Sequence, residues 1–240
     1  MAGDSMRDRL LIVVAAPVEA EAVLRGLGVD GSGICVAWEL VRAGRHDVVV
    51  CGVGKANSAG GVARVLDPSV HRGVLSLGIG GALPGAGLEL GDVVVGRASV
   101  FADEGIETPG GYQGLAEMGF PVGMGLDDAR LEGDGVACDL ELGLGEGLRG
   151  LGGCVVRSGV IATVSTCSGT DVRAREVAER TGAVCEGMEG GAVGLSVRRI
   201  SGKVAFGEVR VVSNTTGDRA RQRWDLRGAL GVLERVGAVL

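Results

Sequence analysis

The chain has 240 residues, which allows one large domain or two small ones, and 46% of them are hydrophobic, so enough apolar surface is present to exclude a disordered acidic chain. Its formal net charge of −6 makes nucleic acid an unsuitable partner, because binding to phosphates relies on clustered basic side chains. No apolar run reaches the roughly 18 residues of a membrane span, and the first residues lead directly into a strand-like run, so the sequence predicts a cytoplasmic protein with no membrane partner.

The first hundred residues alternate short apolar runs with helical patterns. Leu10 to Ala16 has the length and composition of a buried strand, and Pro17 suits the first position of the helix that follows it. The same reasoning predicts strands over residues 34–41, 47–51, 74–77 and 92–95 and helices over residues 19–27 and 56–66.

Residues 103–153 are less regular, and their many glycines predict loops with one or two helices, including a weak strand or helix from Gly135 to Leu142. Order returns with a candidate strand pair over residues 155–164, helices over residues 171–181, up to Val197 and over 225–239, and strands over residues 183–186 and 204–213. Strands that alternate with helices predict an α/β fold with a largely parallel sheet covered on both faces. No break in composition divides the chain, so we expect a single domain over residues 1–240.

Glycine is the outlier of the composition, with 46 residues against a usual share of about 7%. Several of these glycines stand in loops after predicted strands, following Cys51, Leu77, Glu186 and Thr216. Ligands of open α/β sheets bind at the carboxyl ends of strands, and glycine lets the backbone approach a ligand closely. The placement predicts a ligand site at this edge of the sheet.

Two common cofactor motifs are absent. Residues 78–83 lack the third glycine of a dinucleotide fingerprint, and Gly54-Lys55-Ala56 lacks the other elements of a phosphate-binding P-loop. The six cysteines form no C-x-x-C pair and read as reduced core residues. His46 and His71 lie in polar turns, so we expect both to be surface residues, and no zinc spacing occurs.

Five segments occur in the order found in nucleoside phosphorylases and nucleosidases, namely AAPVEAE at 15–21, GVGK at 52–55, GIGG at 78–81 with GDVV at 91–94, GMEG at 187–190 and RVVSN at 210–214. The chain resembles this superfamily throughout. Within it, EGMEG at 186–190, TVST at 163–166 and Ser213-Asn214 are most similar to the futalosine hydrolases. The resemblance implies a three-layer α/β fold with a mixed, mostly parallel central sheet flanked by helices, a homo-oligomer, and no metal or organic cofactor. It also implies hydrolysis of futalosine to hypoxanthine and dehypoxanthinyl futalosine in the alternative menaquinone pathway.

Cleavage of an N-ribosidic bond passes through a ribosyl cation, so such an enzyme needs a base for water, groups that hold the ribose hydroxyls and stabilisation of the departing purine. The resemblance implies that Glu21 activates water, with Glu19 as its rival, because the family spacing shifts by a residue around Pro17. Both could instead be solvent-facing carboxylates favoured by the helix dipole.

The resemblance assigns the ribose to Met188 and Glu189, supported by Arg210, with Glu186 as the alternative carboxylate. The other readings are a helix cap for the carboxylate and a plain surface charge for Arg210.

Asn214 stands where nucleosidases acting on adenine compounds have aspartate. An asparagine can accept from N7–H of a purine and donate through its NH₂ group to a 6-oxo group, so the base should be hypoxanthine-like, unless Asn214 is only a turn residue. The other residues that the resemblance places beside the base are Gly80, Ser165, Thr166, Cys167, Ser213 and Trp224. Trp224, expected at the start of the last helix, could equally be a core anchor.

Two other functions remain open on the sequence. One is a phosphate-dependent nucleoside phosphorylase, which the absence of a Gly-Asp-Pro-x-Arg loop and the presence of Ile79 disfavour. The other is a nucleoside-binding protein without turnover. The group on the ribose 5′ carbon is not readable, although Asp103, Glu104, Tyr112 and Gln113 are candidate contacts for it.

Overall fold

The computed structural model describes residues 7–31, 36–139 and 144–240. In chain order the elements are β1 (Arg9–Val14), α1 (Pro17–Gly26), β2 (Leu40–Ala43), β3 (His46–Val50), α2 (Lys55–Val65), β4 (His71–Ala82), β5 (Val93–Phe101), β6 (Gly105–Thr108), β7 (Gly111–Gly114), β8 (Leu131–Glu132), β9 (Gly135–Ala137), α3 (Leu144–Arg149), β10 (Val156–Thr163), α4 (Asp171–Thr181), β11 (Ala183–Gly187), α5 (Gly190–Ile200), β12 (Ala205–Thr215) and α6 (Leu226–Ala238).

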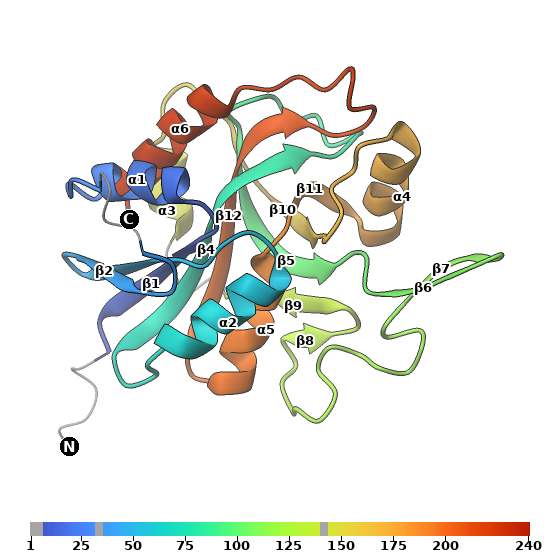
Figure 1. Cartoon of the computed structure of the whole chain (residues 1–240), viewed down its shortest axis with the longest axis horizontal. Coiled ribbons are helices and arrows are strands. Elements are labelled where there is room, and N and C mark those ends of the chain that lie inside the picture. Colours follow the sequence, from blue (N-terminus) through green and yellow to red (C-terminus); the bar gives the residue numbers. More distant parts are fainter. Residues whose placement is uncertain (1–6, 32–35, 140–143) are drawn as a thin grey trace.

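One mixed sheet runs through the centre of the molecule (Figure 1), in the order β2-β3-β1-β4-β11-β10-β5-β9-β8, with β12 paired to both β4 and β5. The long ladders, β1 with β3 and β4, β10 with β5, and β12 with β4, are parallel. Because β12 joins β4 to β5, the strands β4, β11, β10, β5 and β12 form a closed ring of pairings. This closure brings the ends of β4, β11 and β12 together.

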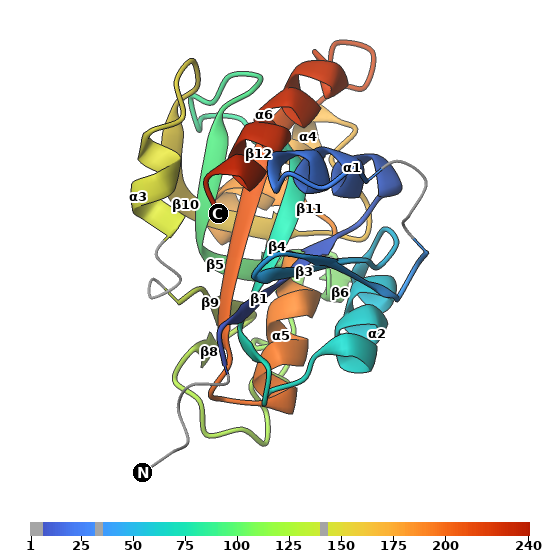
Figure 2. The ribbon, with the colours of Figure 1, turned by 90° about the vertical axis from the view of Figure 1, so that its left-hand side faces the viewer.

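Helices cover both faces of the sheet, as Figures 1 and 2 show from two directions. Helices α1 and α6 pack against each other on one side, and α2 and α5 do so on the other. The core beneath them is almost wholly aliphatic: Leu10, Ile12 and Leu233 belong to the first side, and Val62, Val197 and Val204 to the second. The three-layer α/β fold with a mixed, mostly parallel sheet is therefore confirmed.

Helix α4 begins and ends where the sequence predicted. Thr170 caps it, because its hydroxyl oxygen accepts a hydrogen bond from the amide of Arg173, and Gly182 closes it in the left-handed conformation with φ of 65°. By contrast, β2 spans Leu40–Ala43 and shares only residues 40 and 41 with the predicted 34–41 strand, part of which lies outside the described residues. Residues 155–164 form one strand, β10, and not a pair. Gly135 to Leu142 contains the short β9, and its end also lies outside the described residues.

Strand β4 is much longer than the predicted 74–77, because the glycines expected to leave the strand continue it. A side chain on Gly78 would lie 2.6 Å from the Arg210 guanidinium, and one on Gly80 would lie 2.8 Å from the Glu186 carbonyl oxygen. These glycines therefore serve close packing within the sheet rather than a turn.

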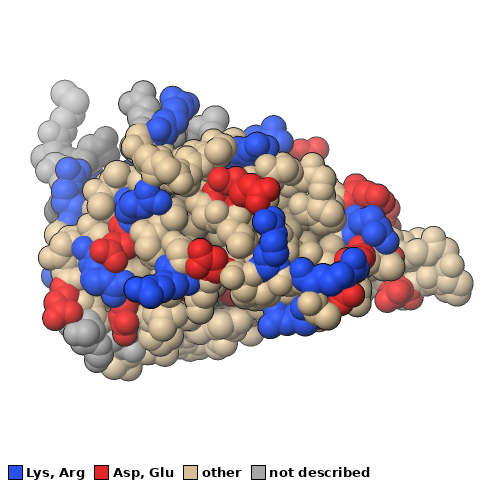
Figure 3. All heavy atoms as spheres, turned by 90° about the horizontal axis from the view of Figure 1, so that it is seen from above, with Lys and Arg blue, Asp and Glu red and all other residues tan. Residues whose placement is uncertain are grey.

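The irregular segment after β5 contains the hairpin of β6 and β7, which projects from the body of the molecule (Figure 1). Acidic and basic side chains are interspersed on the face seen from above, and the tip of the projection carries neither kind (Figure 3). Within the described part of the chain, no helix is both long and apolar enough to cross a membrane.

The prediction that both histidines lie on the surface is wrong for His71, which begins β4 and is 1% exposed. Its Nε2 atom lies 3.1 Å from a carboxylate oxygen of Asp47, which also accepts two hydrogen bonds from Arg9. Burial alone would raise the pKa of Asp47, but the hydrogen bonds from Arg9 and His71 outweigh it and lower that pKa.

We expect Asp47→Asn to lower the free energy of unfolding by about 2 kcal/mol, because the change leaves Arg9 and His71 without a buried anionic partner. The measurement is chemical denaturation at neutral pH. Glu234→Gln is the control, since it removes an exposed ion pair with Arg25 and should cost less than about 1 kcal/mol. Equal losses in the two variants would contradict the prediction.

Candidate active site

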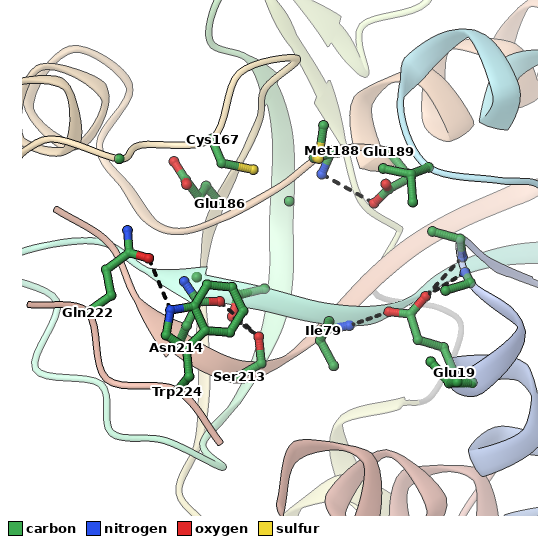
Figure 4. A pocket seen from close by; sticks show the side chains of 18 of the residues that line it. Glu19, Ile79, Cys167, Glu186, Met188, Glu189, Ser213, Asn214, Gln222 and Trp224 are labelled. Atoms are coloured by element: carbon green, nitrogen blue, oxygen red, sulfur yellow. Dashed lines mark hydrogen bonds between the residues drawn. The ribbon is translucent and has the colours of Figure 1, made fainter. Parts of the chain in front are cut away.

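A cavity of about 460 Å³ lies at the carboxyl ends of β4, β11 and β12, next to the start of α1. It is the size of a small-molecule site, mostly apolar with a few polar groups. Figure 4 shows Glu19 at one end, Met188 and Glu189 opposite Ile79, and Asn214 with Trp224 at the other end. The cavity thus lies where the glycine placement predicted a ligand site.

Glu19 enters the cavity from the first turn of α1 and is 4% exposed. One carboxylate oxygen accepts hydrogen bonds from the amides of Ala15 and Ala16, and the other accepts one from the amide of Ile79 on β4, at 2.9 Å. Burial raises the pKa of Glu19, although these amides and the charge of Arg210 oppose the rise. The result is a fixed carboxylate with proton affinity above that of an exposed glutamate.

Glu21 does not line the cavity, which differs from the expectation that it is the water-activating group. Two residues along an α-helix correspond to a rotation of roughly 200°, so Glu19 and Glu21 leave α1 on opposite sides. Glu19 folds back onto the backbone before Pro17, whereas Glu21 is half-buried on the far face, its Cα beside Gly31. The structure therefore places the rival residue in the cavity.

Glu189 follows β11 and reaches the middle of the cavity. It accepts hydrogen bonds from the amides of Gly54 and Met188, both at 3.2 Å, and lies 3.4 Å from the guanidinium of Arg210. Arg210 does not line the cavity but lies directly behind it, 1% exposed, where it also donates to Ser76. Burial opposes the charge of Arg210, but the surrounding carboxylates outweigh burial and raise its pKa.

Glu208 was not identified from the sequence, yet it belongs to the same buried cluster. Its carboxylate accepts a hydrogen bond from Arg210 at 2.8 Å and another from Ser99. A side chain on Gly190 would lie 2.0 Å from the Glu208 carboxylate, so glycine is required there. The available signal was an acidic and a basic residue two positions apart in an apolar strand, which places both on one face.

Glu186 lies at the end of β11, is 4% exposed and lines the cavity. Its two carboxylate oxygens accept hydrogen bonds from the amide of Ser168 at 2.8 Å and from the hydroxyl of Ser168 at 2.6 Å. Burial raises the pKa of Glu186 against these two hydrogen bonds. It is separate from the cluster of Glu189 and Arg210.

Asn214 and Ser213 line the cavity from β12, and Gly80 does so from β4. The Asn214 side-chain oxygen accepts a hydrogen bond from the Ser213 hydroxyl at 2.9 Å, and its nitrogen donates to the Thr215 carbonyl at 3.0 Å. An asparagine amide can make four hydrogen bonds, so a donor and an acceptor position remain for a ligand.

The other residues expected beside the base divide into two groups. Cys167 lines the cavity, as does Trp224, which is 49% exposed and precedes α6 in a backbone bridge with Asn214 rather than starting the helix. Ser165 and Thr166 do not line it; both are exposed, and their amides donate to Asp103. Gly169, further along the same loop, also lines the cavity.

The residues expected to contact the group on the ribose 5′ carbon do not lie together in the structure. Asp103 is paired with Lys55 and accepts from the amides of residues 165 and 166, so it holds that loop beside the cavity. Tyr112 is on the projecting hairpin, with its ring against Arg180. Among the described residues, no group of three or more potential metal ligands is clustered.

A family model and individual relatives both match most of this chain. The family model described as "Phosphorylase superfamily" matches residues 10–238. Proteins named futalosine hydrolase from Acidothermus cellulolyticus and Streptomyces coelicolor are 34% identical over 98% of this chain and 91% of theirs, and 32% identical over 93% and 91%.

Solved structures with the same fold include a 5′-methylthioadenosine/S-adenosylhomocysteine nucleosidase from Neisseria meningitidis, with a TM-score of 0.72, 20% identity and coverage of 97% of both chains. The futalosine hydrolase of Helicobacter pylori aligns with a TM-score of 0.69, 18% identity and coverage of 98% and 95%.

Proposed function

The chain belongs to the phosphorylase superfamily, and from that premise we propose that it is an N-glycosyl hydrolase that cleaves the N-ribosidic bond of futalosine and releases hypoxanthine. Relatives named futalosine hydrolase match most of its length. The observation that carries the proposal is the order of groups along the cavity: a buried carboxylate at one end, a carboxylate held by arginine in the middle, and an amide with free donor and acceptor positions at the other end.

We assign the activation of water to Glu19 rather than Glu21. The carboxylate is fixed by three backbone amides and keeps lone pairs for a water molecule. Burial raises its pKa, which brings a general base closer to the pH at which it works. As water attacks C1′ of the ribosyl cation, Glu19 takes the proton of that water.

We assign the ribose hydroxyls to Glu189, with Met188 on the adjoining wall. Glu189 is oriented by two amides and by Arg210, so its remaining lone pairs face the middle of the cavity. Arg210 acts as a positioning residue, because it is held by Glu208 on one side and reaches Glu189 on the other.

We assign the leaving base to Asn214, with Gly80, Cys167, Ser213 and Trp224 around it. As the glycosidic bond breaks, negative charge develops on the purine, and donation to its 6-oxo group stabilises that charge. N7 gains a proton from solvent water, and the proton that Glu19 takes from the attacking water is returned to solvent, so the protons balance. The Asn214 oxygen can accept from N7–H and its nitrogen can donate to that oxo group. Ser165 and Thr166 contribute only through the loop that Asp103 anchors.

Water rather than phosphate is the nucleophile in this proposal. A phosphate nucleophile would need a cationic side chain near Glu19. Among the described residues that line the cavity, the one arginine is Arg219, and its guanidinium lies 4.6 Å from the ring centre of Trp224. Trp224 is at the end of the cavity away from Glu19. We expect hypoxanthine release from futalosine in phosphate-free buffer at a rate that added phosphate leaves unchanged. Strict dependence on phosphate would show a phosphorylase instead, and binding without release would show a protein that lacks turnover.

We further propose that the chain folds as a single domain over residues 1–240, that it assembles into a homo-oligomer, and that it acts in the cytoplasm. Ile106, Met118, Phe120 and Met124 are exposed in the segment after β5, and exposed large apolar side chains suit a subunit contact. The cysteines of the described residues are free thiols, which suits a reducing compartment.

A further inference from the structure

Gly81, near the end of β4, has a cavity-lining neighbour on each side. It pairs with Glu186 on β11 in an antiparallel register and with Asn214 on β12 in a parallel register. Residues directly opposite one another in a sheet carry their side chains on the same face, and adjacent strands are about 4.8 Å apart. Glu186 and Asn214 therefore flank Gly81 at a spacing of two strands.

The missing side chain of Gly81 opens the space between them. A Cβ atom there would lie 3.0 Å from the Asn214 side-chain nitrogen and 3.5 Å from the Glu186 Cγ atom, and 2.8 Å from a methyl carbon of Thr216. Gly81 and the two residues that flank it, Glu186 and Asn214, all line the cavity. Figure 4 shows the Glu186 and Asn214 side chains entering the same end of it.

None of the roles proposed above is assigned to Glu186. It is nearly fully buried, no described arginine or lysine forms an ion pair with it, and Ser168 occupies one acceptor position on each oxygen. A carboxylate has about four such positions. Burial of an anion without an ionic partner is costly, so a donor supplied by the ligand would complete the site.

We propose that Glu186 is a specificity-determining residue that accepts the N1–H of a 6-oxopurine while Asn214 recognises the N7 and O6 edge of the same ring. The assignment rests on the proposed function, since it concerns the base of that substrate. A 6-oxopurine carries a hydrogen on N1, whereas a 6-aminopurine carries a lone pair there. The Glu186 carboxylate attracts the N1–H of the 6-oxopurine and repels the N1 lone pair of the 6-aminopurine. Asn214 makes no contact with N1 in this arrangement, so it cannot distinguish the two rings there.

The test is the ratio of kcat/KM for futalosine to kcat/KM for its 6-amino analogue, in the wild type and in Glu186→Gln. The glutamine oxygen can keep the Ser168 amide while its NH₂ group faces the ring, where it opposes N1–H and donates to a bare N1. We expect the ratio to fall about 100-fold or more, the range for mispaired buried polar groups. Ser168→Ala is the matched control, because it loosens the carboxylate without removing it and should lower both values with the ratio kept.

A second measurement uses the wild type alone, so that it is independent of how the variant folds. Futalosine methylated at N1 lacks the hydrogen, and we expect its kcat/KM to be at least about 100-fold lower than that of futalosine. Turnover of the methylated nucleoside within threefold of futalosine, or an unchanged ratio in folded Glu186→Gln, would overturn the role of Glu186 and leave the hydrolase intact. Failure of the wild type to release hypoxanthine from futalosine would overturn both.

Discussion

Replacement of Glu19 by glutamine is expected to reduce kcat for futalosine hydrolysis by about 100- to 10,000-fold, the scale of losing a general base. The amide keeps the size of the carboxylate but cannot take a proton from water. Its oxygen can still accept from the amides of Ala15 and Ala16, so the start of α1 keeps part of its hydrogen bonding. The measurement is single-turnover release of hypoxanthine at saturating substrate.

Glu21→Gln is the control for this prediction, because it makes the same chemical change two residues away on the opposite side of α1. We expect its kcat to stay within about threefold of the wild type, since loss of a carboxylate that does not line the cavity has little effect on transition-state stabilisation. A large loss in Glu21→Gln with an active Glu19→Gln would reverse the assignment of the base.

The pH profile adds a second readout. A general base must be deprotonated, so kcat of the wild type should fall as pH drops through the pKa of Glu19. Burial raises that pKa, which places the midpoint of the acid limb above the usual glutamate value of about 4.3. In Glu19→Gln the residual activity should lose this limb, and an unchanged limb would assign it to another group.

The choice between Glu19 and Glu21 illustrates what the sequence could predict. The helix, its start at Pro17 and a candidate carboxylate in its first turns could be predicted, because these features depend on local pattern and on motif order. Which of the two carboxylates enters the cavity depends on the rotation of α1 against β4, and in the structure it is Glu19 that accepts a hydrogen bond from Ile79 on β4, 60 residues away.

The glycines after Leu77 also show which features local sequence predicts and which depend on tertiary contacts. Their position at the edge of a ligand site was predictable, but their continuation of β4 was not, because it depends on side chains from other strands. Gly78 and Gly80 leave room for Arg210 and for the backbone of Glu186. Helix α4, with its own cap at Thr170 and its own stop at Gly182, needed no such information.

Replacement of Asn214 by aspartate is expected to shift the preference from 6-oxo toward 6-amino nucleosides by about 100-fold or more, measured as the ratio of kcat/KM for futalosine and its 6-amino analogue. The aspartate loses the NH₂ group that donates to the 6-oxo oxygen. In its protonated form it can donate to N7 while the other oxygen accepts from a 6-amino group. The Ser213 hydroxyl, which donates to Asn214 at 2.9 Å, can still donate to either side chain.

The shift in Asn214→Asp should come mainly from loss of futalosine turnover, because Glu186 still presents an acceptor to the bare N1 of the 6-amino analogue. Two residues that contact one ring are not independent, so Asn214→Asp combined with Glu186→Gln should gain more turnover of the 6-amino analogue than the two single changes predict together. Asn214→Ala is the control, since it removes both hydrogen bonds and should lower turnover of both nucleosides. A preference in Asn214→Asp equal to that of the wild type would contradict the hydrogen-bond assignment of Asn214.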